Sequence, residues 1–187
     1  MNLKLIKHIL FYCGNFRKNE NLLLIYDQPS EKIFIKFKNF LDSQKLNFDF
    51  IKTKNFNVHG KDLGKNIEKK MVTSDLILCL TENSFAHSKE RLKSEKKGVR
   101  FLSLVNFSSK RLQLKSLIAP FKNYAKKAKK LKKILNNGKI IEVVSADGIR
   151  LLANIYKRKS NFCPGYVNKN ILLGSPPDVE TNISPVE

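Results

Sequence analysis

The sequence predicts an α/β fold: a doubly wound, mostly parallel sheet, followed by a β-hairpin that begins a second, truncated lobe. Three observations lead to this fold class. Four short apolar segments of strand length each precede a segment with the periodicity of an amphipathic helix. Two of them, residues 22–26 and 76–80, are continuously apolar, as expected of strands buried on both faces. A hairpin pattern replaces the alternation after residue 137.

The first predicted elements are a helix, a strand and a second helix. Apolar residues recur at helical spacing over residues 3–13, and Gly14 is a plausible end for that helix. The apolar run at 22–26 predicts the first strand, which ends at Asp27. A helix then opens after Pro29, and one apolar stripe runs along it through Ile33, Phe34, Phe37, Phe40 and Leu41.

Two more pairs of strand and helix follow. Residues 46–50 alternate between apolar and polar side chains, which predicts the second strand, and residues 63–71 carry the spacing of a helix. Residues 76–80 predict the third strand. The side-chain oxygens of residues 81–84 are suited to capping the next helix, and Gly98 stands where a left-handed C-terminal cap belongs.

The fourth strand is predicted at residues 101–105, ahead of a long lysine-rich helix. The apolar face of this helix runs from Leu112 to Leu135 and is interrupted near Pro120. Strands that alternate with helices pair in parallel through crossover connections. We therefore interpret residues 1–137 as a Rossmann-like α/β lobe whose four strands lie side by side in one sheet.

A different organisation is predicted for residues 138–187. Residues 140–145 and 149–156 flank an Ala146-Asp147-Gly148 turn, which predicts an antiparallel hairpin. From Ser160 onward Pro, Gly and Asn are frequent, and we expect no terminal helix or strand at residues 184–187. The chain thus looks cut off within its second lobe.

The net charge of +20 is the most unusual feature of the composition. Residues 96–141 contain 14 Lys or Arg and no Asp or Glu. Such a patch can bind nucleic acid or another anionic surface, since Lys and Arg make most phosphate contacts. We favour a solvated helix face, because the stretch offers few aromatic side chains for stacking beyond Phe121 and Tyr124. Nucleic acid is therefore an unlikely partner.

Several function classes lack sequence support. No apolar run approaches the roughly 20 residues of a membrane span, and no signal peptide is apparent. The thiols Cys13, Cys79 and Cys163 form no C-x-x-C pair, which argues against a disulfide framework or a zinc site and favours the cytoplasm. The glycine-rich motifs that bind nucleotide phosphates are missing after the first strand.

Candidate ligand-binding residues follow the strands, because ligands of open α/β sheets bind beyond the carboxyl ends of the strands. This rule selects Asp27 and residues 81–87. Within that segment, we interpret Ser84 as a helix cap in preference to a nucleophile, because no base stands near it in sequence. His87 lies without any ligand spacing to His8 or His59 and is interpreted as a structural or capping residue.

The segment at residues 81–91 resembles the T-x-x-S-x-x-H-[ST]-x-x-R motif of the leucyl aminopeptidases of the aminopeptidase T type, which are thermophilic metallopeptidases. The matching residues are Thr81, Ser84, His87 and Arg91, whose roles the resemblance does not fix. Gly98-Val99-Arg100 and the Asp147-Gly148 turn are similar to further family features. Residues 177–187 resemble its P-x-G-E-V-x-x-x-P-x-E segment, although Val179 replaces the glycine.

The resemblance implies metal-dependent release of N-terminal residues from peptide substrates. It implies that Glu180 is a ligand of paired divalent ions such as zinc or cobalt. One carboxylate cannot hold two metal ions, and the family's remaining ligands lie in a C-terminal lobe without a counterpart here. We therefore expect this part to bind no metal and to be inactive alone. Whether the chain forms a homodimer is left open.

Three alternatives remain at this point. Some relatives of the same fold use a single iron for ring-opening dioxygenation. The chain could also be a basic α/β module that binds nucleic acid, or a subunit whose catalytic lobe is supplied by another chain.

Overall fold

The computed structural model describes residues 3–107, 115–118 and 121–186. These residues form two compact units. The first comprises residues 1–119 and 165–177, and the second comprises residues 120–164 and 178–187. The division differs from the boundary expected after residue 137, because the lysine-rich helix belongs to the second unit and a tail segment returns to the first.

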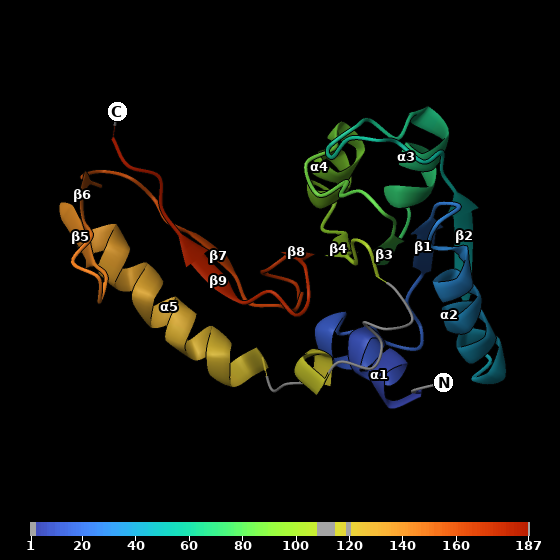
Figure 1. Cartoon of the computed structure of the whole chain (residues 1–187). Coiled ribbons are helices and arrows are strands. Elements are labelled where there is room, and N and C mark those ends of the chain that lie inside the picture. The colour runs from blue at the N-terminus through green and yellow to red at the C-terminus, as the bar shows by residue number, and fades with distance from the viewer. Residues whose placement is uncertain (1–2, 108–114, 119–120, 187) are drawn as a thin grey trace. The chain divides into compact units, whose positions relative to one another are not determined.

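A five-stranded parallel sheet forms the centre of the first unit (Figure 1). Its strand order is β2-β1-β3-β4-β8, and every neighbouring pair is parallel. The predicted fold class and the side-by-side arrangement of the four strands are therefore confirmed. The strands are β1 (Leu22–Tyr26), β2 (Phe48–Lys52), β3 (Leu76–Leu80), β4 (Arg100–Ser103) and β8 (Leu173–Gly174).

Helices cover both faces of this sheet (Figure 1). On one face, α3 (Lys65–Met71) packs on a buried cluster that includes Leu23 and Phe101, and α4 (Lys89–Glu95) lies against α3. On the other face lie α1 (Leu3–Lys7), the π-helix η1 (His8–Cys13) and α2 (Glu31–Ser43). Alternate side chains of a strand point to opposite faces, so the continuously apolar β1 and β3 serve both layers.

The helix after β3 begins later than predicted. Residues 81–84 form no cap, and Ser88 is the N-cap instead, since its Oγ accepts a hydrogen bond from the backbone N–H of Arg91 at 3.2 Å. The prediction mistook an irregular loop rich in oxygen-bearing side chains for a helix start, because both have the same composition. The predicted left-handed cap at Gly98 is confirmed by its φ of +81°.

In the second unit, α5 (Phe121–Asn137) is followed by the predicted hairpin of β5 (Ile140–Val144) and β6 (Arg150–Asn154). A short antiparallel ladder of β7 (Asn161–Cys163) and β9 (Glu180–Asn182) packs beside α5. None of the strands after residue 160 is among the elements predicted from the sequence. Strands of two or three residues have too short a pattern to be recognised from sequence.

The apolar face of α5 is only partly buried. Phe121, Ala125 and Leu135 are buried, whereas Leu131 is 46% exposed and Ile134 is 67% exposed. Residues 108–114 and 119–120, which include the predicted start and interruption of this helix, lie outside the described residues. Within the described part of the chain, no helix is long and apolar enough to cross a membrane.

Candidate functional site at the carboxyl ends of the strands

Asp27 joins the loops that follow β1 and β3. Its side chain is 1% exposed. One carboxylate oxygen accepts a hydrogen bond from the backbone N–H of Ser30 at 3.1 Å, and the other accepts one from the N–H of Glu82 at 2.7 Å. The strand order reverses between β1 and β3, so Asp27 fastens together the two loops at the point where open α/β sheets bind ligands.

A second set of hydrogen bonds connects the loop after β2 to the loop after β3. The backbone N–H of Ser84 donates to Nδ1 of His59 at 2.9 Å, and the N–H of Gly60 donates to the Ser84 carbonyl at 2.7 Å. The amide of Asn55 donates to the Glu82 carboxylate at 2.9 Å. Because Nδ1 of His59 accepts, a neutral imidazole must carry its proton on Nε2.

A small hollow of about 170 Å³ lies beyond β1, β3 and β4. Asn106 is one of its lining residues, and its backbone N–H donates to the Thr81 carbonyl at 2.9 Å. Asn106 adopts a φ of +48°, a left-handed conformation that asparagine tolerates better than most residues. The lining combines apolar and polar side chains: Pro29, Ser30, Lys32, Ile33, Glu82, Asn106 and Phe107. Its position is the one predicted for a ligand site from the strand ends.

The four motif residues have separate surroundings. The buried Thr81 donates through Oγ1 to the Asn83 carbonyl at 2.7 Å, and Oγ of Ser84 accepts from the Ala86 N–H at 3.2 Å. His87 is exposed, and the buried Arg91 forms an ion pair with a neighbouring glutamate on α4. Among the described residues, no hydrogen bond or ion pair joins any two of the four. They form a folded loop and helix start.

The predicted metal ligand Glu180 lies on β9 in the second unit. It is exposed, and its carboxylate accepts a hydrogen bond from Asn182 at 3.0 Å. Burial and the nearby Glu180 charge both raise the pKa of Asp178 above its ordinary value. In the described residues no three His, Cys, Asp or Glu side chains are grouped so as to hold a metal ion. The ligand role of Glu180 stays a prediction.

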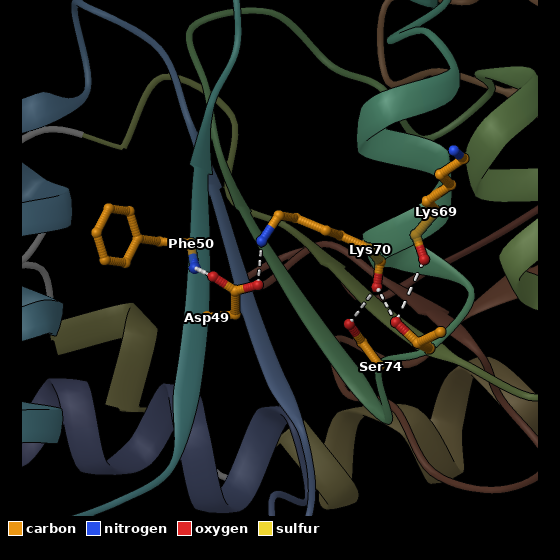
Figure 2. A network of polar contacts seen from close by, with 6 residues as sticks. Asp49, Phe50, Lys69, Lys70 and Ser74 are labelled. Carbon is orange, nitrogen blue, oxygen red and sulfur yellow. Dashed lines mark hydrogen bonds and ion pairs between the residues drawn. The ribbon is translucent and has the colours of Figure 1, made fainter.

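A second hollow, of about 310 Å³, lies at the opposite edge of the sheet, where β1 and β2 begin. Figure 2 shows Lys70 reaching Asp49 on β2, while Lys69 points away. The hydrogen bond from Lys70 holds the pKa of Asp49 below its usual range. The Ser74 hydroxyl donates to the Lys70 carbonyl at 2.7 Å. These contacts close the end of α3 and tie it to β2, which gives this network a structural role.

Comparison with known proteins gives one clear fold relationship. No protein-family model and no curated protein match the sequence. The structure of 2,5-dihydroxypyridine dioxygenase from Pseudomonas putida KT2440 is similar over 99% of this chain, with a TM-score of 0.71 and 16% sequence identity. The two proteins share a fold. The chain spans 56% of the length of that dioxygenase, so much of the enzyme has no counterpart here.

This relationship corrects the predicted family. The similarity is to a dioxygenase, and no match supports a leucyl aminopeptidase, a peptidase or a hydrolase. The misleading motif has a local explanation: Ser84 forms a turn and Ser88 caps α4, and loops of this type use such residues in many unrelated proteins. The alternative of a dioxygenase relative is better supported than the main interpretation.

Sequence reasoning missed several parts of the site. Asn55 and Asn106 were not selected, and His59 was considered only as a histidine without ligand spacing to His87. Asn106 closely follows β4 and could have been found by applying the strand-end rule to every strand instead of only to the first and third.

Proposed function

We propose that this chain forms the α/β part of an iron-dependent ring-opening dioxygenase, and that the hollow beyond β1, β3 and β4 receives a dihydroxylated aromatic ring. The observation that carries the proposal is the fold similarity to 2,5-dihydroxypyridine dioxygenase along 99% of the chain. A shared fold raises the expectation of a related reaction without fixing it, because one fold hosts many chemistries.

The size and lining of the hollow support this ligand class. A cavity of roughly 150 Å³ is known to hold a benzene molecule, so about 170 Å³ suits one six-membered ring. Ile33 and Phe107 offer apolar contacts to the ring. Lys32 and Asn106 can donate hydrogen bonds to ring oxygens, and Glu82 can accept from a ring hydroxyl.

The iron of such an enzyme would need donors from outside this part of the chain. Among residues 3–107, 115–118 and 121–186, no group of three metal-ligating side chains fits an iron centre. The dioxygenase neighbour extends well beyond the length matched here. We therefore propose that a further polypeptide segment completes the metal site, while this chain binds and orients the ring.

Ring binding can be tested without iron. Titration of 2,5-dihydroxypyridine into the purified chain should give a dissociation constant on the order of millimolar, since a ligand of this size gains only a few kcal/mol. Glu82→Gln should weaken binding about tenfold, because hydrogen bonds to charged groups contribute about 1.5–3 kcal/mol. Asp42→Asn, on α2 and outside the hollow's lining, is the matched control. Equal effects of the two variants would contradict the assigned site.

The reaction itself can be tested with a fusion to the part of the Pseudomonas enzyme that has no counterpart here. With Fe(II) and 2,5-dihydroxypyridine, the fusion should consume oxygen and the chain alone should not. Circular dichroism and iron content report whether the fusion has folded. A folded, iron-loaded fusion that leaves oxygen untouched would contradict the proposed reaction, and oxygen uptake by the chain alone would contradict the argument from missing donors.

A further inference from the structure

A basic groove of about 490 Å³ lies within the second unit. Four of its six lining residues are cationic, and none is acidic. Two residues come from the C-terminal half of α5, and the others form one turn after β6. The lining residues are Lys132, Asn136, Lys157, Arg158, Lys159 and Ser160.

The two walls of the basic groove are fastened to each other. The N–H and the hydroxyl of Ser160 both donate to the side-chain oxygen of Asn136 at 2.8 Å, and Ser160 is 5% exposed. Lys157 sits at a φ of +61°, an uncommon conformation for lysine, and the Arg158 N–H donates to the Ile155 carbonyl at 3.0 Å. The turn therefore presents consecutive cations from a fixed backbone.

The four cations of the basic groove form no ion pair with any residue that the structure describes. Nε of Arg158 donates a hydrogen bond to the Ser184 carbonyl at 3.1 Å. The two outer guanidinium nitrogens form no hydrogen bond with the described residues, so they can donate to a ligand. The second unit holds twelve Lys or Arg against five Asp or Glu. Such a cluster repels itself until an anion binds.

We propose that the basic groove binds phosphate groups, either of a nucleic-acid strand or of a small polyphosphate. The mixture of a guanidinium fork and flexible ammonium groups suits phosphate oxygens better than a single carboxylate. The sequence argued against nucleic acid because the lysine-rich stretch had few aromatic residues. The structure adds two from outside it: Lys157 lies 5.2 Å from the ring centroid of the half-exposed Tyr156, and Lys132 lies 5.8 Å from that of Phe162.

The test compares two triple variants that remove the same charge. One is Lys157→Gln, Arg158→Gln and Lys159→Gln in the groove, and the control is Lys126→Gln, Lys127→Gln and Lys130→Gln on α5, outside the lining. Fluorescence anisotropy with a labelled single-stranded DNA 20-mer at low salt measures affinity. The groove variant should bind at least about tenfold more weakly and the control less than about threefold, because only the groove cations contact phosphate.

Salt and competition identify the source of the phosphate. Three phosphate contacts predict a slope near −2 for log K against log salt, and the groove variant should flatten it. Tripolyphosphate that displaces the DNA at similar concentration assigns a small polyphosphate, whereas displacement only by unlabelled DNA assigns a nucleic-acid strand. If the groove variant misfolds, the exposed Lys159→Gln alone should weaken binding about threefold. Equal losses from both triple variants, or no binding of either probe by the unaltered chain, would overturn the proposal.

Discussion

Different interactions stabilise the two units of this protein. All five residues of β1 and all five of β3 are buried in the first unit, between helices on both faces. In the second unit the hairpin is open: Ile149 is 70% exposed, Leu151 58% and Leu152 62%. Burial of a large apolar side chain contributes about 1.5–3 kcal/mol. The first unit is therefore stabilised by its core, and the second depends far more on local hydrogen bonds.

Thiol reactivity should show the largest difference between the units. Burial raises the pKa of Cys13 and of Cys79 to about 12, and both lie in the first unit. At pH 8 a thiol with that pKa has only about one molecule in 10⁴ as thiolate, which is the reactive form. Cys163, in the second unit, is half-buried.

Native protein should therefore react with iodoacetamide at Cys163 long before the other two thiols, and all three should react in urea. Mass spectrometry after digestion measures each site. Cys163→Ser is the control, since it should leave the native protein nearly unlabelled. Fast native labelling of Cys79 would show that the sheet opens readily, and the contrast between the units would then fail.

Matched leucine truncations should show the next largest difference. Leu78 on β3 is 0% exposed, and Leu78→Ala should cost about 2–5 kcal/mol through lost burial and the cavity left behind. Leu152 on β6 is 62% exposed, so Leu152→Ala should cost less than about 0.5 kcal/mol. Urea titration followed by far-UV circular dichroism measures both. Similar costs at the two positions would mean that the hairpin is buried in solution.

The same contrast explains how much of the fold could be predicted from the sequence. The strands Leu22–Tyr26 and Leu76–Leu80 can be recognised in the sequence because burial on both faces requires an unbroken apolar run. The short β8 pairs with β4 through Phe101 and Leu102 alone, and no pattern of two residues could reveal it. The strands of four or five residues in this sheet carry a recognisable pattern, whereas the two-residue β8 is defined only by its pairing in the folded chain.

The sequence predicted the location of the candidate site but not the contacts that build it. The strand-end rule selected Asp27 and the loop that begins at Thr81, and the hollow does lie there. The partners of that loop, Asn55 and His59, come from a different loop, and only the folded chain shows the contact. The basic groove is a similar case, because Lys132 and Lys157 are far apart in sequence and share one surface.

Exposed ion pairs should distinguish the units least. Lys70 and Asp49 pair in the first unit and Arg150 and Glu142 in the second, and every one of these side chains is more than a third exposed. Such pairs contribute about 0–1 kcal/mol, so Asp49→Asn and Glu142→Gln should each lower the free energy of unfolding by less than about 1 kcal/mol at pH 7. The Lys70 hydrogen bond lowers the pKa of Asp49, so the stabilisation is present above the ordinary carboxyl pKa of about 3.9 and is lost as the pH falls through the lower folded value. Urea titrations at pH 7 and near pH 3 should therefore show that Asp49→Asn lowers the free energy of unfolding less at the lower pH. A constant loss of more than about 2 kcal/mol at both pH values would mean that Asp49 acts through packing and not through its charge.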